Sequence, residues 1–469
     1  MAEGHDLARR LEGIVGERGV VTGEADTAPY LTDWRRAFSG RALAVVRPAS
    51  TDEVSAVVKL CAEEGIPVVP QGGNTGMCGG AIADDSGRSV VVAMGRMNRI
   101  LDVDARNNTA TAEAGCVLAD LQAAAARERR LFPLSLAAEG SCQIGGNVST
   151  NAGGLNVLRY GNTRELTLGL EAVLPDGSVW NGLRSLRKDN TGYDLKQLFI
   201  GGEGTLGIVT RVVVKLHPAI RERTTVMAAV PTLDAAVELL ARLREHCGET
   251  ISAFELVSRQ CLDLVLQHAS GARDPFTHAS AWYVLAEGGD THAGGDLRDR
   301  LEAGLLAATE GGIITDAVIA ESMAQRETLW RLREALPEAI RAEGLAFRSD
   351  VAVAVGRVPA FVAEAEADLR RAFPGIRIVC FGHLGDGNLH FNALPDRDSA
   401  LSSDWAREVA RVLYDAVGRY DGSISAEHGI GQAKRGELAR CKSAIEMTLM
   451  RQVKRMLDPN GLMNPGKLL

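Results

Sequence analysis

Three glycine-rich segments constrain the fold of this chain more than any other feature, because none of them has a helical or strand period. They are Pro70–Gly80, Gly140–Gly154 and residues 201–207. A long stretch of this kind inside a compact domain is typically a functional loop, so we expect 140–154 to be loop throughout. Glycines permit positive φ and let an anion approach the backbone closely. Ordinary turns would explain any one segment, but the three together favour one large ligand contacted at several places.

The glycine-rich segments lack the context of the common nucleotide motifs. Gly202–Gly207 matches the spacing G-x-G-x-x-G, but the β-branched run after it predicts a strand over Leu206–Leu216, where a dinucleotide phosphate would need a helix N-terminus. No Gly-Lys-Ser/Thr follows Pro70–Gly80, which argues against a nucleotide-hydrolysing loop. The ligand is therefore expected to contact backbone amides and small polar side chains such as Asn74 and Thr75.

A second feature is the segment 382–390, Gly-His-Leu-Gly-Asp-Gly-Asn-Leu-His, which predicts a β-hairpin. Asp386-Gly387 is a favoured pair for a two-residue hairpin loop. The residues on either side predict short strands over Phe381–Leu384 and Leu389–Ala393.

This register places two imidazoles where both can reach one metal ion. His383 lies directly opposite His390, with β-carbons roughly 5 Å apart, and Asn392 shares their face because it follows His390 by two residues. Glu427 and His428 add a carboxylate and an imidazole in a glycine-flanked loop. Two histidines and one carboxylate are typical of an open, catalytic divalent-metal site. A packed, purely structural histidine pair is the alternative, and three of the nine histidines falling in these two segments disfavours it.

Composition excludes several classes of protein. A chain of 469 residues predicts two or three domains, and 46% hydrophobic with 24% charged residues is typical of a soluble globular protein. A net charge of −8 with dispersed Lys and Arg argues against nucleic-acid binding. The sequence has no apolar run of about 18 residues, the length that would predict a membrane span. Eight scattered cysteines without C-x-x-C spacing, and an N-terminus without a secretory signal, predict reduced, mostly buried thiols and a cytoplasmic location.

The first part of the chain predicts alternating strands and helices. Ser50 or Thr51 is expected to cap a helix that runs to Glu64. His217-Pro218 marks the expected domain boundary.

From Thr224 the pattern changes and predicts an α+β sandwich, with helices on one face of a mainly antiparallel sheet. One of these helices is expected over Met323–Glu343. The last helix is expected over Ala444–Leu457, because Ser443 and Glu446 have the spacing of a capping box.

Five segments together resemble a known family. They are Pro70–Gly80, Gly140–Gly154, Ser185–Gly201, the histidine hairpin and Ser423–Gly431. They resemble the FAD-dependent D-2-hydroxy-acid dehydrogenases of the vanillyl-alcohol-oxidase-type flavoproteins, and within that family the branch that oxidises D-2-hydroxyglutarate. The resemblance extends from about residue 40 to Leu469.

The resemblance implies a fold of class α+β. A two-subdomain FAD-binding domain is expected over 1–218, and an α+β, ferredoxin-like cap domain with the metal-binding hairpin over 219–422. The segment 423–469 would return to the FAD-binding domain. FAD is expected to be noncovalent, since covalent relatives often carry a histidine in the first glycine loop, where this chain has Asn74.

The resemblance also implies roles for individual residues. The metal ligands would be His383, His390 and Glu427, and the metal zinc or manganese. The catalytic base would be His428. The substrate would contact Arg333, Arg348, Asn392 and His428. The FAD-binding positions would be Gly72, Gly73, Asn74, Thr75, Gly76, Gly79, Gly80, Ser141, Gly145, Gly146, Asn147, Thr150, Asn151, Gly153, Gly154, Glu203 and Ile208.

Two positions depart from the pattern of the hydroxyglutarate-oxidising branch. That branch has a threonine four residues after the substrate arginine and a lysine further on, both for the distal carboxylate, and here these positions hold Pro337 and Arg348. Proline has no hydroxyl, whereas arginine keeps the charge with a different reach. A dicarboxylate substrate is still expected.

The implied reaction is oxidation of a D-2-hydroxy acid to the 2-oxo acid by hydride transfer to flavin. D-2-hydroxyglutarate, giving 2-oxoglutarate, is expected before D-lactate, D-malate or glycolate. The implied electron acceptor is an electron-transfer flavoprotein or a quinone, and the implied oligomer a homodimer. Two other classes stay open: a metal-dependent hydrolase, which would be colourless, and an electron-transfer flavoprotein without substrate turnover.

Overall fold

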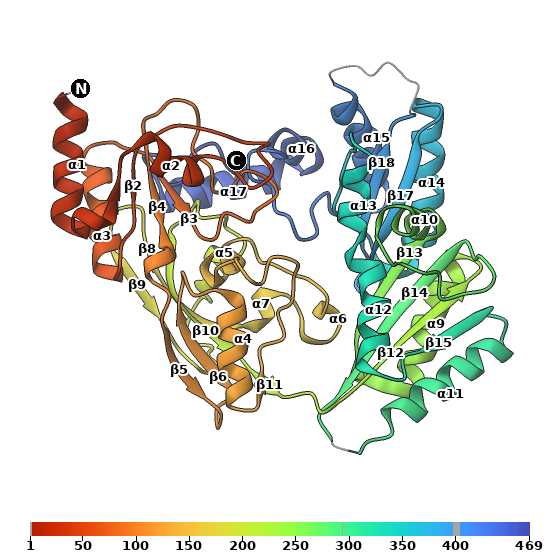
Figure 1. Cartoon of the computed structure of the whole chain (residues 1–469). Helices are drawn as coiled ribbons and strands as arrows, with labels where there is room; N and C mark the ends of the chain where they lie inside the picture. The colour runs from red at the N-terminus through yellow and green to blue at the C-terminus, as the bar shows by residue number, and fades with distance from the viewer. Residues whose placement is uncertain (1, 293, 397–403) are drawn as a thin grey trace. The chain divides into compact units, whose positions relative to one another are not determined.

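The computed structural model describes residues 2–292, 294–396 and 404–469 and divides into two compact units, each built around its own sheets (Figure 1). Unit 1 comprises the chain up to Gly154, Gly161–Ala219 and Glu427–Leu469. Unit 2 comprises Leu155–Tyr160 and Ile220–Ala426.

Unit 2 thus differs in two places from the expected 219–422. It continues to Ala426, and it includes the short helix α6 (Val157–Tyr160) from the first half of the chain. Leu158 packs on the apolar core of unit 2 and the Arg159 guanidinium donates to the Gly289 carbonyl, so tertiary contacts place a segment there that its sequence position does not.

The first sheet of unit 1 is mainly parallel. Its elements are β1 (Val20–Val21), β2 (Ala42–Val46), β3 (Val68–Gln71) and β4 (Ser89–Ala93), with α1 (Ala2–Val15), α2 (Glu24–Leu31) and α3 (Thr51–Glu63). The strand order is β1-β2-β4-β3, with only β1 antiparallel to its neighbour. The Ser50 hydroxyl accepts the Glu53 N–H at 3.2 Å, which confirms the helix start after Ser50.

The second sheet of unit 1 is antiparallel, in the order β5-β6-β10-β8-β9. Its strands are β5 (Ile100–Asp104), β6 (Thr109–Glu113), β8 (Thr167–Val173), β9 (Val179–Gly182) and β10 (Ile208–Lys215), and β7 (Arg130–Leu131) pairs with β11 (His217–Pro218). The helices are α4 (Leu118–Arg127), α5 (Ile144–Ser149), α7 (Thr163–Leu166), α8 (Lys196–Phe199), α16 (Arg435–Cys441) and α17 (Ala444–Leu457). The strand predicted after Gly202–Gly207 is confirmed as β10, so this G-x-G-x-x-G segment does not open a helix.

The expectation of loop throughout 140–154 is wrong, because α5 forms inside it. The helix contains Gly145 and Gly146, which no propensity scale favours in a helix. Gly145 is required by packing: a β-carbon there would lie 2.6 Å from the Ala114 β-carbon. Close contact with the sheet therefore overrides the local preference.

Unit 2 contains one antiparallel sheet in the order β15-β12-β14-β13-β17-β18-β16. Its strands are β12 (Glu222–Val230), β13 (Ile251–Ser258), β14 (Trp282–Asp290), β15 (Asp316–Ile319), β16 (Val351–Ala352), β17 (Arg377–His383) and β18 (Asn388–Leu394).

Helices cover both faces of this sheet, which corrects the expectation of one covered face. They are α9 (Leu233–Cys247), α10 (Arg259–His268), α11 (Leu297–Glu310), α12 (Met323–Glu334), α13 (Leu336–Ala342), α14 (Val358–Ala372) and α15 (Trp405–Arg419). Residues of α9, α11, α14 and α15 form one core with Phe254 and Leu256, and residues of α10, α12 and α13 form the other with Ala253 and Val257. Because every residue of β13 is buried, both of its faces need a cover.

The single helix expected over Met323–Glu343 is two helices, α12 and α13, which meet at Ala335. Pro337 is the second residue of α13 and is exposed. Proline lacks the N–H that an uninterrupted helix would need and its ring conflicts with the carbonyl four residues earlier, so the interruption is a direct consequence of this residue.

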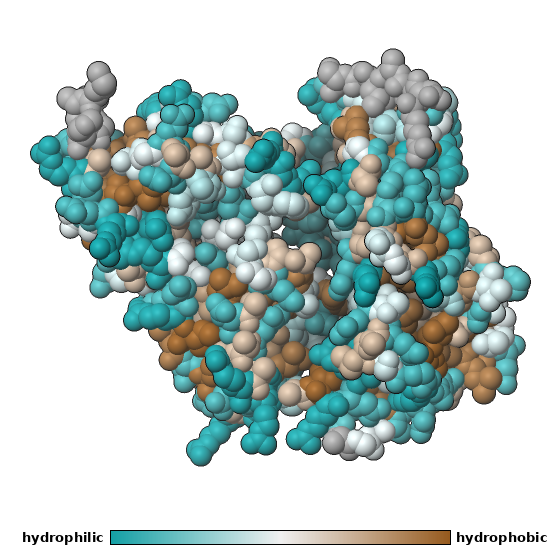
Figure 2. All heavy atoms as spheres, in the orientation of Figure 1, coloured by the Kyte–Doolittle hydropathy of each residue, from teal (hydrophilic) through white to brown (hydrophobic). Residues whose placement is uncertain are grey.

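The predicted capping box and the predicted burial of most cysteines are confirmed. In α17 the Ser443 hydroxyl accepts the Glu446 N–H at 3.3 Å, and the Glu446 carboxylate accepts the Ser443 N–H at 3.0 Å, forming the capping box. Seven of the eight cysteines are buried, and Cys441 is exposed. Within the described part of the chain no helix is long and apolar enough to cross a membrane. Figure 2 shows hydrophilic residues over most of the visible face, with hydrophobic ones in smaller patches.

Candidate active site

The histidine hairpin of unit 2 forms in a different register from the one predicted. His383 lies opposite Asn388, and Phe381 lies opposite His390. The turn is longer than two residues because the Asp386 carboxylate accepts the Asn388 N–H at 3.1 Å and the Asp386 N–H donates to the His383 carbonyl at 3.2 Å. Direct opposition of the two histidines was therefore wrong. Since the register differs by two residues, both imidazoles still point to one face, with ring centroids 5.6 Å apart.

The edge of the sheet adds two more side chains to this face. The observed pairs between this edge and β18 are Phe347–Ala393, Val351–Leu389 and Ala352–Asn388. This register places Arg348 opposite Asn392 and Asp350 opposite His390. Asn392 is buried and its side-chain oxygen accepts the Ser349 N–H at 3.1 Å, which fixes its orientation. The sheet thus brings the predicted substrate residues Arg348 and Asn392 to the histidine face.

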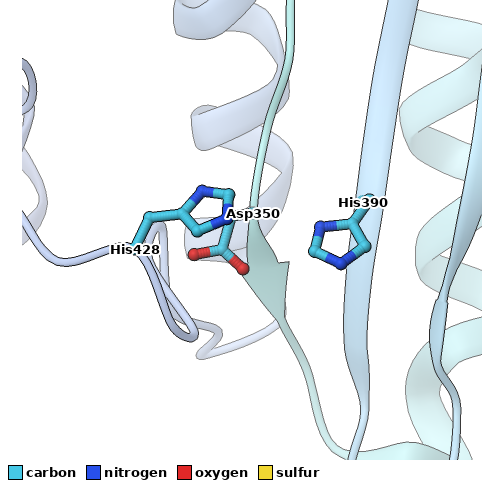
Figure 3. A group of neighbouring side chains, drawn as sticks. All are labelled: Asp350, His390 and His428. Carbon is cyan, nitrogen blue, oxygen red and sulfur yellow. The ribbon is translucent and has the colours of Figure 1, made fainter. Parts of the chain in front are cut away.

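The predicted metal ligands lie within reach of one ion. One nitrogen or carboxylate oxygen from each of His383, His390 and Glu427 lies within 4.8 Å of the other two. A second group with the same spacing consists of Asp350, His390 and His428, whose side chains point toward one another (Figure 3). Glu427 and His428 directly follow Ala426, whose N–H donates to the Asp350 carbonyl at 3.3 Å. The nitrogen and carboxylate donor set suits zinc or manganese.

A buried carboxylate contacts two of the residues on this face. Glu255 on β13 has no exposed surface, and its two oxygens contact His383 Nδ1 at 2.5 Å and Arg333 Nε at 2.8 Å. Burial by itself raises the pKa of this carboxyl, but the charges and hydrogen bonds of His383 and Arg333 outweigh it and lower the pKa to about 2. The Arg333 guanidinium lies 4.6 Å from the centre of the Phe381 ring. Arg333, a predicted substrate residue on α12, is therefore fixed on the same face.

Unit 1 contains a cavity lined by all three glycine-rich segments. The predicted cofactor residues that line it are Gly72, Gly73, Asn74, Thr75, Gly76, Gly80, Gly145, Gly146, Asn147, Thr150, Glu203 and Ile208. His428 also lines it. The predicted residues outside its lining are Gly79, Ser141, Asn151, Gly153 and Gly154. One cavity thus unites segments more than a hundred residues apart in the sequence.

Several predicted cofactor residues have structural partners of their own. The Asn74 amide, at φ 53°, donates to the Thr32 carbonyl at 2.9 Å, so this side chain anchors the loop. The Asn151 oxygen accepts the Arg164 N–H at 2.9 Å. A β-carbon at Gly73 would lie 2.1 Å from the Ser141 carbonyl oxygen, so this glycine brings two loops together.

The cavity fits a group with several hydrogen-bonding atoms. The Gln143 Oε1 and Asn147 Oδ1 atoms line it, are buried and have no hydrogen-bond partner in the described part of the chain. A β-carbon at Gly146 would meet no atom within 4 Å, so the backbone there borders open space. These acceptor oxygens suit the N–H and hydroxyl donors of a flavin and its ribityl chain, and the bare backbone beside them allows such a group to approach closely. The residues present therefore fit FAD.

Glu203 ties the C-terminal segment to this cavity. It has φ 51°, and its carboxylate accepts the N–H groups of Ile430 and Gly431, each at 2.7 Å. Burial raises the pKa of Glu203 despite these two donors. The Asn464 amide donates to the carbonyls of Glu203 and Gly80 at 2.8 and 3.0 Å. The residue is therefore part of the scaffold that holds the first glycine loop.

Sequence reasoning missed Glu255, Asp350 and Gln143. Glu255 stands in the otherwise apolar run Ala-Phe-Glu-Leu-Val, and a charged residue within such a run is a signal in the sequence. Asp350 has no motif of its own, and its position opposite His390 depends on long-range strand pairing. Gln143 lay inside the segment taken as loop and carries no signal of its own.

Comparison with known proteins identifies the family. The FAD binding domain family matches residues 42–182, and the FAD linked oxidases, C-terminal domain, match residues 220–468. A D-2-hydroxyglutarate dehydrogenase of Xanthomonas citri is 41% identical, over 98% of this chain and 96% of its own. The mitochondrial D-2-hydroxyglutarate dehydrogenases of Arabidopsis thaliana and Bos taurus are 39% and 38% identical, over 97% and 99% of this chain and 80% and 83% of theirs.

Solved structures show the same fold at low identity. p-Cresol methylhydroxylase superimposes with a TM-score of 0.77 at 18% identity, over 100% of this chain and 97% of its own. Alkyldihydroxyacetonephosphate synthase gives 0.73 at 17% identity, over 98% and 84%. The expected vanillyl-alcohol-oxidase-type fold is thereby confirmed.

The chain is an FAD-linked oxidoreductase of the FAD-linked oxidase class. Within this class it belongs to the D-2-hydroxyglutarate dehydrogenase family.

Proposed function

We propose that this enzyme oxidises a D-2-hydroxy acid, D-2-hydroxyglutarate first among them, to the 2-oxo acid, with FAD and a divalent metal ion as cofactors. The observation that carries the proposal is the gathering of His383, His390, Asn392, Arg333 and Arg348 on one face of the unit 2 sheet. Nitrogen ligands suit a metal, and two arginines suit a substrate with two carboxylates.

The chain's own residues supply binding and proton transfer. His383, His390 and Glu427 would hold the metal ion, and the cavity residues of unit 1 would hold FAD. Bound there, the metal ion would supply Lewis-acid polarisation of the hydroxy-acid oxygens, and FAD would supply the acceptor for the C2 hydride. His428 would accept the hydroxyl proton on an imidazole nitrogen, since a neutral imidazole acts as a general base.

Arg333 and Arg348 differ in their burial and in the N–H groups that they can present to a substrate. Arg333 is buried and its Nε donates to Glu255, so only its terminal amino groups can donate to a substrate carboxylate. Arg348 is half-buried at the edge of the same face. We propose that Arg333 binds the carboxylate beside the hydroxyl group and Arg348 the distal one.

Flavin reduction tests the proposal directly. The purified protein should show the flavin band near ~450 nm, and anaerobic D-2-hydroxyglutarate should bleach it, while the L-enantiomer should not. The same measurement with D-malate, D-lactate and glycolate, each tested separately, shows which acid reduces the flavin most readily. A colourless protein would favour the metal-dependent hydrolase, and a yellow protein that none of these acids reduces would favour an electron-transfer flavoprotein.

Reoxidation requires a second partner. We propose an electron-transfer flavoprotein or a quinone as the electron acceptor, because the reduced flavin must return its electrons for turnover. Reoxidation of the bleached protein by each acceptor in turn distinguishes them.

A further inference from the structure

Glu255 is a buried charged residue to which the proposed reaction assigns no part. It lies at the middle of β13, directly opposite His383 on β17. Its Oε1 contacts His383 Nδ1 at 2.5 Å, and its Oε2 accepts the Arg333 Nε–H at 2.8 Å. Each oxygen of one carboxylate is thus committed to a different residue of the candidate active site.

The contact with His383 determines which ring nitrogen carries the proton. An ionised carboxylate can only accept hydrogen bonds, so the proton of a neutral His383 must be on Nδ1. The lone pair is then on Nε2, which makes Nε2 the ring nitrogen with ligand character. Histidines that bind metals generally donate their other N–H to such a group, which orients the ring and raises its basicity.

The contact with Arg333 fixes a guanidinium in two directions. Glu255 holds its Nε edge, and the Phe381 ring lies below its plane at 4.6 Å. The Phe381 ring also lies 4.9 Å from the His390 ring, measured between centroids. A shift of Glu255 would therefore disturb the arginine and the metal-binding histidine together.

We propose that Glu255 is a positioning residue that sets the tautomer of His383 and the orientation of Arg333 at the same time. This inference rests on the proposed function, in which His383 binds the metal and Arg333 the substrate carboxylate. One buried side chain thereby fixes the position of the metal site relative to the group that binds the acid.

The geometry requires a carboxylate at this position. Glutamine has the same shape but one acceptor and one donor. If its oxygen accepts from His383, its NH₂ group faces the Arg333 N–H, and two donors meet. If its oxygen faces Arg333, its NH₂ group donates to His383 Nδ1 and moves the ring proton to Nε2. Either orientation loses one of the two functions.

The test compares Glu255→Gln with Glu287→Gln in the flavin-loaded protein. Glu287 is a matched control, because it is buried on the neighbouring strand β14 and accepts from Arg326 and Trp330 of α12, but contacts no histidine of the site. The measurements are Zn²⁺ affinity after chelator treatment, and KM and kcat for D-2-hydroxyglutarate at saturating Zn²⁺.

We expect E255Q to lose roughly 10- to 100-fold in Zn²⁺ affinity when the NH₂ group faces His383. When it faces Arg333 instead, KM should rise by about tenfold or more and kcat should fall less, whereas E287Q should keep both values near those of the wild type. Equal values in E255Q and E287Q for both measurements would overturn the inference and leave Glu255 with a purely structural role.

A second pair of variants covers the case in which an unpaired Arg333 unfolds E255Q. The double variant E255Q/R333Q has no buried unpaired charge, and its Zn²⁺ affinity should be about tenfold below that of R333Q. Equal affinities would overturn the inference. The wild type distinguishes failure of the proposed function from failure of this inference. If the wild type binds no Zn²⁺, the proposed metal site is refuted and the role of Glu255 with it. If the wild type binds Zn²⁺ and E255Q is unaffected, only the role of Glu255 is refuted.

Discussion

Arg348 and Asn392 show how single residues reach the candidate site. Strand alternation places Asn392 on the histidine face, whereas Arg348 has no motif of its own, and the substrate role of both is implied by family resemblance. Their common face follows from the register of the sheet edge with β18, which places them opposite each other. At position 348 the hydroxyglutarate-oxidising branch has a lysine, and the arginine of this chain keeps the positive charge.

Replacing Arg348 with Ala should therefore discriminate between substrates. A distal carboxylate left without its cationic partner should lower kcat/KM on D-2-hydroxyglutarate by about 2 kcal/mol or more, which is roughly 30-fold. Activity on D-lactate, which has no second carboxylate, should change far less. Steady-state kinetics on both substrates measures the difference.

Arg341→Ala is the matched control, because Arg341 lies on α13, is exposed and pairs only with its helix neighbour Glu338 among the contacts described, at 2.6 Å. It should leave both substrates unaffected. Equal losses on D-2-hydroxyglutarate and D-lactate in R348A would instead mean that Arg348 stabilises unit 2 and that the substrate is a monocarboxylate.

At the scale of elements, α5 has a function that its composition hides. Its glycines weaken the helix, yet Gly145 packs against Ala114 and Gly146 exposes bare backbone to the cavity. Gly73 differs, because a side chain there would collide with the Ser141 backbone before it reached any ligand. Substitutions at Gly73 and Gly146 therefore test different properties. Only a substitution at Gly146 should change cofactor binding without disturbing the packing of the loops.

Gly146→Val should weaken FAD binding without unfolding unit 1. The new side chain enters open space next to the backbone, where overpacking against a bound cofactor typically costs ~1–3 kcal/mol, so the FAD dissociation constant should rise about tenfold. Flavin content after gel filtration and the melting temperature of the apoprotein give the two readouts.

Gly436→Val provides the control, since Gly436 also lies in a short helix, α16, and a β-carbon there meets no atom within 4 Å, but it is outside the cavity lining. It should retain normal flavin content. If G146V retained as much flavin as G436V, the cavity of unit 1 would not be the FAD site.

At the scale of the whole molecule, the cavity that fits FAD and two of the three predicted metal ligands belong to different units. The cavity that fits FAD is lined by residues of unit 1, whereas His383 and His390 belong to the sheet of unit 2. Loss of one cofactor should therefore not require loss of the other.

The double variant His383→Ala/His390→Ala should bind no stoichiometric metal and lose most turnover, while its flavin content stays near that of the wild type. Metal analysis and the flavin spectrum of one sample measure both. His246→Ala is the control, because this histidine is exposed on α9 of the same unit. Full metal occupancy in the double variant would refute the metal site, and loss of FAD would show that the units are coupled.

The sequence by itself determined the features that depend on neighbouring residues. The N-cap at Ser50, the capping box at Ser443, the strand after Gly202–Gly207 and the presence of a hairpin at 382–390 follow from local hydrogen bonding and side-chain alternation. Long motifs also identified the family, since the five matching segments are specific in combination.

Only the tertiary structure decided which residues meet. The hairpin register depends on the Asp386 turn, the α5 helix on close packing against Ala114, and the second covered face of the unit 2 sheet on the burial of β13. Glu255 contacts His383 because β13 and β17, more than a hundred residues apart, are neighbours in the sheet. Long-range strand pairing leaves no periodic trace in the chain, so a charged residue in an apolar strand can be noticed in the sequence but its partner cannot.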